Sequence, residues 1–277
     1  MSIYSRNSIS LSQNLTKQHH QHKSFLRRIK RQRLLIRVSQ VLIISLFIVI
    51  WQICADCGLI NTFVASSPKA VVKTIIGLYN DGSLAYHMEI TFYEVFISFI
   101  IGTFIGIAIA TILWCNKFLA KVFDPYLTVL NSLPKVSLGP IIIIVAGAGI
   151  KSIIIMALFI SVIITIMNVY QAFISTDINK IRLMRSFKAN KWQIYTKLIL
   201  PSNFKNIINV CKVSLSLTFI GVIMGEFLVS KAGVGYLIMY GSQVFNLNLV
   251  ITGIILLAFM ASLLYYLILF IEKRLSN

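Results

Sequence analysis

Six long apolar segments, separated by short polar stretches, are the feature of this chain that most limits its fold. A helix of about 20 apolar residues rises about 30 Å, which is the thickness of the hydrocarbon core of a bilayer. Only 12% of the 277 residues are charged, against about 25% in a typical soluble domain. The sequence therefore predicts an all-α, polytopic membrane protein with about six transmembrane helices. The expected spans lie at about 38–54, 95–114, 125–148, 152–172, 207–229 and 249–271.

The basic residues are distributed unevenly along the chain, and this asymmetry predicts its orientation. Lys and Arg number 26 against 8 Asp and Glu, which gives a formal net charge of +18, and they avoid the apolar segments. Nucleic-acid-binding proteins share such a charge, but the positions fit better with the rule that Lys and Arg gather on the cytoplasmic side of membrane proteins. Six spans place both termini and the basic loop at 173–206 on one side. We therefore expect a multi-pass plasma-membrane protein with both termini in the cytoplasm and no nucleic-acid partner.

Residues 1–37 are predicted to form a disordered basic tail, and residues 38–277 the transmembrane domain. The beginning of the tail lacks the apolar content of a folded segment. Its histidines at 19, 20 and 22 offer metal ligands, although a disordered tail explains them more simply. Seven basic residues between 23 and 37 directly precede the first span. They favour an anchor on anionic membrane lipid over a nucleic-acid-binding arm.

Cys54 and Cys57 form a C-x-x-C pair at the end of the first span. This spacing occurs in redox and metal sites. We prefer to interpret them as two small apolar residues near a helix end, because nothing else in the chain has metal-ligand spacing. No metal site is predicted.

Prolines and glycines interrupt the apolar pattern at two places. Pro134, Gly139 and Pro140 break the third segment, and broken helices occur at membrane depth where they face protein or a water-filled path. Gly233 and Gly235 lie between the fifth and sixth segments. Both places are candidates for a solute path or gate.

Glu94 and Glu226 are the acids nearest to the ends of spans. A charge in the middle of a bilayer costs about 2.5–3.5 kcal/mol on insertion scales, so buried acids commonly have a function. Two interpretations stay open for Glu226: it lines the path or fixes a helix end against the Gly233 segment, or it lies at the interface in contact with water. For Glu94 we prefer the interface.

The segment at 173–206 carries seven basic residues and one acid, yet it has the pattern of a folded element. Thr176 and Asp177 can cap one helix and Asn190 a second, and Pro201 stops or kinks the second helix. Each helix has an apolar face, formed by Ile178, Ile181 and Met184 and by Trp192, Tyr195 and Leu198. The pair either rests on lipid or docks on a cytoplasmic partner.

Four stretches resemble, in the same order, motifs of the permeases of binding-protein-dependent ABC transporters. They are Ser67-Pro68-Lys69-Ala70-Val71, Asn131-Ser132-Leu133-Pro134 with Gly139-Pro140, the loop from Arg182 to Gln193 ending in Leu198-Ile199-Leu200-Pro201, and Gly225-Glu226-Phe227 with Gly233-Val234-Gly235-Tyr236-Leu237. The resemblance covers about residues 66–274. It is nearest to the branch that imports nitrate, sulfonates, taurine or thiamine precursors, and no motif identifies the solute.

The resemblance implies the transmembrane subunit of an importer rather than an enzyme. The chain has no G-x-x-x-x-G-K-[ST] phosphate loop, so we expect ATP to bind to a partner and no cofactor to bind to this chain. The implied partners are a cytoplasmic ATPase, an extracytoplasmic solute-binding protein, a second permease copy about a two-fold axis and membrane lipid. The implied ATPase-coupling residues are Arg182, Met184, Arg185, Phe187, Lys188, Ala189, Trp192 and Pro201. The implied path or gate residues are Pro134, Gly139, Glu226, Gly233 and Gly235.

Two residues of the loop depart from the family pattern. Arg182 stands where the loop usually has an acid, and Lys188 stands where it usually has glycine. Glycine suits a turn with positive φ, which is unfavourable for lysine. We therefore expect a slightly different turn here rather than poor coupling, because the flanking helical pattern is intact.

The main alternative function is that of an ion-coupled secondary transporter. Such a transporter needs buried acids at mid-span and commonly has internal repeats, and the sequence shows neither clearly. A membrane enzyme would need His, Asp or Glu clustered at one face of the membrane. The eight acids of this chain are too scattered for that.

Overall fold

The computed structural model describes residues 31–32 and 34–275. Every element in this part of the chain is helical, which confirms the predicted all-α fold. The chain consists of two compact units: residues up to 62 together with 67–69, and residues 63–66 together with 70–277. The predicted tail, including its histidines, lies almost entirely outside the described residues.

Five helices among the described residues are long and apolar enough to cross a bilayer. A bent pair, Lys117–Ser132 followed by Lys135–Ala146 at 88°, makes a sixth if it counts as one span. This agrees with the predicted number. One helix begins much earlier than predicted, at Ser83 instead of near residue 95. The five helices are Leu34–Asp56, Ser83–Cys115, Ile150–Ile174, Phe204–Val229 and Leu247–Arg274.

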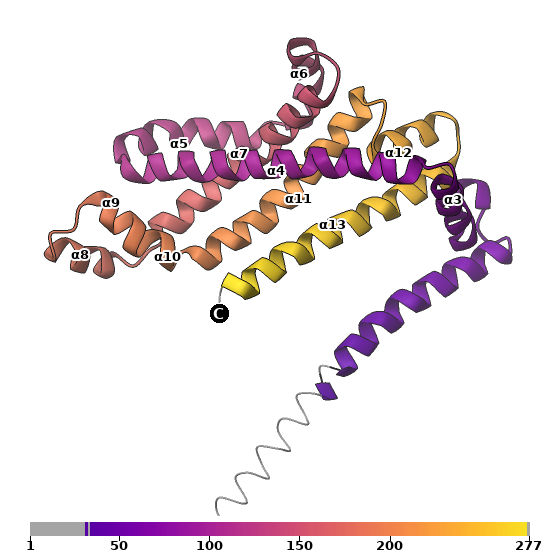
Figure 1. The fold of residues 1–277 in the computed structure, drawn as a ribbon, viewed down its shortest axis with the longest axis horizontal. Coiled ribbons are helices and arrows are strands. Elements are labelled where there is room, and N and C mark those ends of the chain that lie inside the picture. Colours follow the sequence, from indigo (N-terminus) through magenta and orange to yellow (C-terminus); the bar gives the residue numbers. More distant parts are fainter. Residues whose placement is uncertain (1–30, 33, 276–277) are drawn as a thin grey trace, which may run out of the picture. The chain divides into compact units, whose positions relative to one another are not determined.

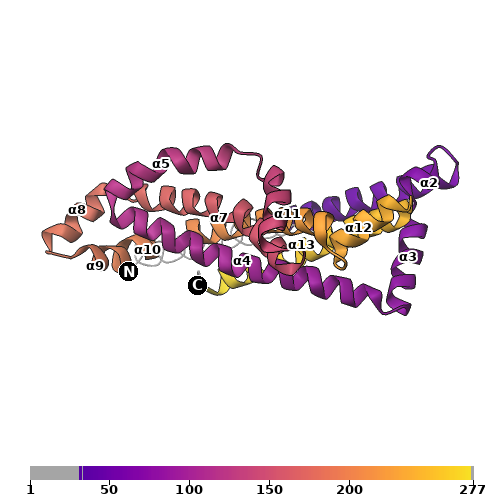
Figure 2. The same cartoon turned by 90° about the horizontal axis from the view of Figure 1, so that it is seen from above.

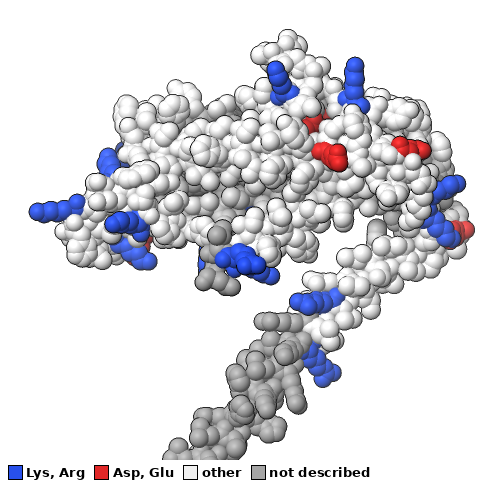
Figure 3. Space-filling model, viewed as in Figure 1, with Lys and Arg blue, Asp and Glu red and all other residues white. Residues whose placement is uncertain are grey.

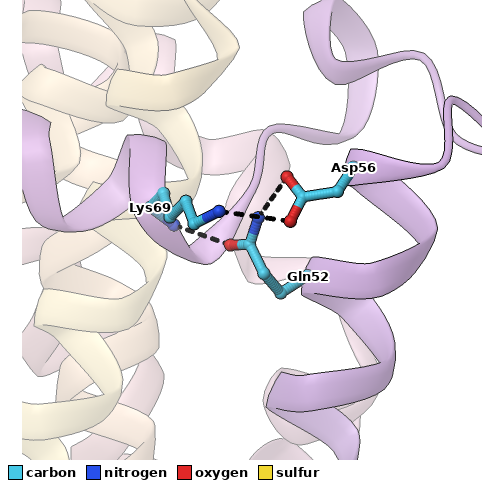
Figure 4. A network of polar contacts seen from close by, with 3 residues as sticks. All are labelled: Gln52, Asp56 and Lys69. Carbon is cyan, nitrogen blue, oxygen red and sulfur yellow. Dashed lines mark hydrogen bonds and ion pairs between the residues drawn. The ribbon is translucent and has the colours of Figure 1, made fainter.

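The first unit contains the helix Leu34–Asp56, whose C-terminal turns contact Lys69 through two hydrogen bonds (Figure 4). The Lys69 ammonium donates to Asp56 Oδ2 at 3.2 Å, and the Lys69 N–H donates to Gln52 Oε1 at 3.1 Å. Gln52 Nε2 in turn donates to Asp56 Oδ1 at 2.8 Å. All these groups are exposed, so they fix a local geometry and contribute little to stability. Cys54 and Cys57 are free thiols.

The centre of the second unit is formed by α4 (Ser83–Cys115), α7 (Ile150–Ile174) and α11 (Phe204–Val229), which pack along one another (Figures 1 and 2). Small residues make the close approach possible. A Cβ atom on Gly106 of α4 would lie 2.5 Å from Thr165 Cγ2 of α7. A Cβ atom on Gly221 of α11 would lie 2.5 Å from the Ala157 Cα of α7. Backbone and short side chains therefore fill these two interfaces.

Two further helices, α12 (Val234–Gln243) and α13 (Leu247–Leu275), pack against each other and against α11. Near the C-terminus of α13, Glu272 Oε2 accepts from Lys212 Nζ of α11 at 2.7 Å. Both side chains are largely buried, so this ion pair links the ends of the two helices.

The broken third segment is formed by α5 (Lys117–Ser132), the 3₁₀-helix η1 (Lys135–Leu138) and α6 (Gly139–Ala146). Asn116 caps α5 by accepting from the N–H groups of Phe118 and Leu119. The chain turns at Leu133 and Pro134, which have extended or irregular backbone. The predicted interruption is therefore confirmed as a sharp bend.

The remaining elements are short. They are α2 (Thr62–Ala65), α3 (Pro68–Asn80), α8 (Ile178–Ser186), α9 (Lys191–Ile194), the π-helix η2 (Tyr195–Ile199) and α10 (Leu200–Ser202). On the face drawn in Figure 3, Lys and Arg gather over α8 and α9, while most of the surface of the long helices is uncharged, apart from acidic side chains near α12. This pattern fits helices that lie in lipid with a basic loop outside it.

Candidate functional site

The α8–α10 loop (Ser175–Asn203) is a folded element held by the predicted caps. Asp177 caps α8 by accepting from the Asn179 N–H at 2.8 Å. Asn190 and Gln193 form a reciprocal capping box at the start of α9. Thr176 does not cap α8, but its hydroxyl accepts from Asn203 Nδ2 at 2.7 Å and so closes the base of the loop.

Lys188 adopts the left-handed conformation, with φ 57°. The Ala189 N–H donates to the Met184 carbonyl, and the Lys188 N–H donates to the Arg185 carbonyl. This pair of bonds is a Schellman motif, in which the left-handed position is usually glycine. The expected altered turn is therefore wrong, because Lys188 adopts the left-handed conformation that glycine usually takes at this position of such a turn.

The loop has one face against the protein and one exposed face. Ile181, Met184 and Ala189 pack partly buried against a core of aromatic and aliphatic residues around Phe173 and Ile199. Ile178 is exposed, so the predicted apolar face of α8 is shorter than expected. The other predicted coupling residues are exposed, with Phe187 at 73% and Trp192 at 64%. Those residues are Arg182, Arg185, Phe187, Lys188, Trp192 and Pro201.

Pro201 lies near the end of a continuous run of helical residues from Lys191 to Ser202. A π-helical turn, Tyr195–Ile199, directly precedes it. Proline cannot donate the regular backbone hydrogen bond, and such bulges accompany its absence. The irregularity that Pro201 predicts in this helix is confirmed, and the helical run ends at the C-cap residue Asn203.

Tyr195, in the π-helical turn, connects the loop to the long helices, a role that the sequence did not reveal. Its hydroxyl forms a 2.8 Å hydrogen bond with Thr111 Oγ1 in α4. Its ring packs edge-on against Phe173 of α7, tilted against Trp114 of α4, and stacked on Trp192 of the loop. The exposed Trp192 therefore contacts Tyr195, and Tyr195 in turn contacts the two long helices α4 and α7.

Glu226 is the centre of a second group of residues, named here the Glu226 cluster: His87, Thr91, Glu226 and the backbone of Gly233–Gly235. Glu226 is 1% exposed, so its interpretation as a water-exposed interface residue is wrong. Thr91 Oγ1 donates to Glu226 Oε1 at 2.6 Å, and the Gly235 N–H donates to Oε2. The interpretation of Glu226 as the residue that fixes a helix end against the Gly233 segment is confirmed.

The Glu226 cluster binds the N–H groups at the start of α12, which lack partners within the helix. Thr91 Oγ1 accepts from the Val234 N–H at 2.8 Å, and His87 Nδ1 accepts from the Gly233 N–H at 3.0 Å. The positive end of the α12 helix dipole lies at this point and also stabilises the negative charge of the Glu226 carboxylate.

Gly233 and Gly235 leave the space that the carboxylate occupies. A Cβ atom on Gly233 would lie 2.4 Å from Glu226 Oε1, and one on Gly235 would lie 2.6 Å from Oε2. Gly233 also has a φ of 110°, a conformation that other residues rarely adopt. The G-x-G spacing is therefore explained by close packing against one buried acid.

Glu94 is fully buried, at 0% exposure, so the prediction that it lies at the interface is wrong. The reason is the early start of α4, which brings Glu94 into the packed part of the helix. No polar pattern in the sequence distinguished this burial from exposure.

The other predicted path residues lie apart from one another. Pro134 is exposed at the bend, whereas Gly139 is buried where a Cβ atom would meet Met156 of α7 and Leu228 of α11. Leu228 follows Glu226 by two residues, so the bend and the Glu226 cluster both adjoin the C-terminal turns of α11.

A family model described as a binding-protein-dependent transport system inner membrane component matches residues 102–277. The chain belongs to this family. The permease is therefore the membrane-spanning subunit of an ABC importer and not an enzyme. Membership also implies an ATPase and a solute-binding protein as partners.

Among curated proteins, the permease is 28% identical over 238 residues to the putative aliphatic sulfonates transport permease SsuC of Bacillus subtilis, covering 85% of each chain. It is 26% identical over 241 residues to the riboflavin transport system permease RibX of Chloroflexus aurantiacus, covering 84% of this chain and 87% of RibX. Among solved structures, it resembles a chain of the MetNI methionine ABC transporter with a TM-score of 0.59 and 20% identity, covering 68% of this chain and 92% of that one. The predicted family and its sulfonate-type branch are confirmed.

Proposed function

We propose that the permease forms the import path for a small organic anion of the sulfonate, taurine or nitrate type, or for a solute like a thiamine precursor. The α8–α10 loop docks on a cytoplasmic ATPase that binds ATP, and two copies of the permease, with both termini in the cytoplasm, enclose the path in the lipid. The bend at Pro134 and Gly139 and the Glu226 cluster form its gate. An extracytoplasmic binding protein delivers the solute and supplies most of the selectivity.

The observation that carries this proposal is the two-sided construction of the α8–α10 loop. Its inner side packs on α4 and α7 through Tyr195, while its outer side presents Phe187 and Trp192 among basic residues. Exposed aromatic side chains of this kind are common anchors of protein interfaces. The inner contacts carry the movement of the ATPase to the spans, and alternating access follows from two arrangements that ATP biases.

The change Phe187→Ala tests the docking surface. Because it removes an exposed aromatic anchor, we expect solute uptake by proteoliposomes to fall about tenfold, as a loss of about 1.4 kcal/mol at an interface implies. The permease should still insert into the membrane. Phe104→Ala is the matched control, because Phe104 is 75% exposed on the side of α4. Equal uptake by the two variants would contradict the docking surface.

The alternative, an ion-coupled secondary transporter, gains support from one observation: Glu94 and Glu226 are buried acids within helices that are long and apolar enough to cross a bilayer. The two functions differ in their energy source. Uptake into proteoliposomes that hold the permease, its ATPase and its binding protein should require ATP and no ion gradient. Uptake driven by a proton or sodium gradient without ATP would favour the alternative.

The same assay, run with labelled sulfonates, taurine, nitrate and thiamine precursors, identifies the solute class.

A further inference from the structure

Glu94 of α4 and Glu226 of α11 are two carboxyl groups that lie next to each other in the core, with exposed fractions of 0% and 1%. Thr91 lies one turn before Glu94 on the same face of α4, and its hydroxyl donates to Glu226. The Glu94 and Glu226 side chains also interact with each other directly. Two carboxylates in contact within an apolar environment do not both stay ionised.

The surroundings of the two carboxyl groups are unequal. Glu226 accepts from the Thr91 hydroxyl and the Gly235 N–H, and it lies at the positive end of α12. Both oxygens of Glu94 are buried, and no described residue donates a hydrogen bond to them. The Ser98 hydroxyl, one turn further along α4, is also buried without a partner among those residues. The negative charge is therefore stabilised on Glu226 and not on Glu94.

No basic side chain in the described part of the chain forms an ion pair with either carboxyl group. The two ion pairs among the described residues join Lys69 to Asp56 and Lys212 to Glu272. His87 belongs to the Glu226 cluster, but its Nδ1 accepts the Gly233 N–H and so carries no proton. Its ring stacks on Tyr236, the titratable residue that α12 brings to this region.

The two other long helices of the second unit, α7 and α13, add no compensating charge beside the pair. The Lys and Arg residues of α7 and α13 lie at the ends of those helices, at Lys151, Lys273 and Arg274, and all three are exposed. An uncompensated second negative charge in such a place would be very unfavourable.

We propose that the Glu94 carboxyl group is a proton-binding site, in which a carboxylic acid donates its O–H to the carboxylate of Glu226. Binding one proton from solvent forms one O–H bond on Glu94 and leaves one negative charge on the pair. Both carboxyl groups then have hydrogen-bond partners. The proton links α4 to α11 and, through Glu226, to the first turn of α12. This assignment holds for any solute that the permease carries.

A proton fits this place better than a metal ion. Only two acids converge here, and no group of three His, Cys, Asp or Glu side chains that could hold a metal occurs among the described residues. Calcium and magnesium need six or more oxygen ligands. A proton needs one donor atom and one acceptor, which the pair supplies.

Infrared spectroscopy of the full-length permease, labelled with ¹³C-glutamate, tests the assignment. The chain has four Glu residues, of which Glu89 is exposed and Glu272 is paired with Lys212. A protonated Glu carboxyl band at neutral pH can therefore arise only from the Glu94–Glu226 pair. We expect such a band in the wild type, loss of it in Glu94→Gln, and retention of it in the control Glu89→Gln.

Thermal unfolding gives a second readout. Glu94→Gln should unfold close to the wild-type temperature, because its amide donates to Glu226 as the acid does, whereas Glu226→Gln should unfold at a clearly lower temperature. The absence of a protonated Glu band in the wild type at neutral pH would overturn the proposal, whether or not either variant folds. A band that persists in Glu94→Gln would also overturn it, as would wild-type stability that rises with added sodium, potassium or calcium.

Discussion

At the scale of the residue, the turn after α8 holds a lysine where the backbone favours glycine. Lys188 completes the Schellman motif at φ 57°, and a left-handed residue with a Cβ costs about 1–2 kcal/mol. The side chain is exposed, so nothing in the core requires it there. The loop therefore maintains its turn through two backbone bonds in spite of its sequence.

Lys188→Gly should relieve this cost. We expect the free energy of unfolding to rise by about 1 kcal/mol, net of the extra freedom that glycine gives the unfolded chain. Denaturant unfolding of the permease in detergent measures this free energy of unfolding. Lys180→Gly, at an exposed position within α8, is the control with the opposite sign and should cost about 0.5–1 kcal/mol. A loss of stability in Lys188→Gly would mean that the lysine itself makes a stabilising contact.

Glu94 shows why single residues were harder to predict than spans. It stands before an apolar run in the sequence, beside Tyr93 and three residues after Thr91, and this pattern is typical of a span end at the interface. Its burial depends on α11 and α12, which are more than 100 residues away in the chain. Such long-range packing leaves no local signal. Asp177 and Asn190, by contrast, act through N–H groups two or three residues away, and their caps were predicted correctly.

At the scale of the element, the start of α12 has two glycines, Gly233 and Gly235, whose lack of side chains leaves room for the Glu226 carboxylate. The Glu226 side chain occupies the space that side chains at 233 and 235 would fill, so the start of the helix and the end of α11 are fixed together. The sequence predicted this contact between Glu226 and the Gly233 segment as one of two interpretations. It could not decide between them because burial of Glu226 depends on α4.

Gly235→Ala should disturb this contact. The added Cβ would lie 2.6 Å from Glu226 Oε2 and 2.9 Å from Glu226 Cβ, and such overpacking costs about 1–3 kcal/mol of unfolding free energy. Gly77→Ala in α3 is the matched control, because nothing lies within 4 Å of the added atom. It should gain about 0.5–1 kcal/mol, as glycine weakens a helix interior. Equal changes in the two thermal midpoints would show that Glu226 moves aside freely.

At the scale of the whole molecule, the number and order of spans followed from the sequence, but their packing did not. Large apolar side chains face lipid and other helices alike, because no hydrophobic difference separates the two environments. Ile144 is 82% exposed and Ile153 is 1% exposed, although both belong to apolar runs. Pro134 and Gly139 predicted a break, while the 88° between α5 and α6 depends on what Gly139 packs against.

Tyr195→Phe tests how the α8–α10 loop is connected to the rest of the permease. The change removes the hydroxyl that bonds Thr111 of α4 and keeps the ring contacts, so about 0.5–1.5 kcal/mol of the link is lost. We expect uptake per ATP hydrolysed to fall several-fold in proteoliposomes, while co-purification with the ATPase stays unchanged. Tyr170→Phe is the matched control, since Tyr170 packs against the same core and no hydrogen bond to its hydroxyl occurs among the described residues. If both variants couple alike, the movement of the loop must reach the spans through packing alone, because the Tyr195–Thr111 bond would then transmit nothing.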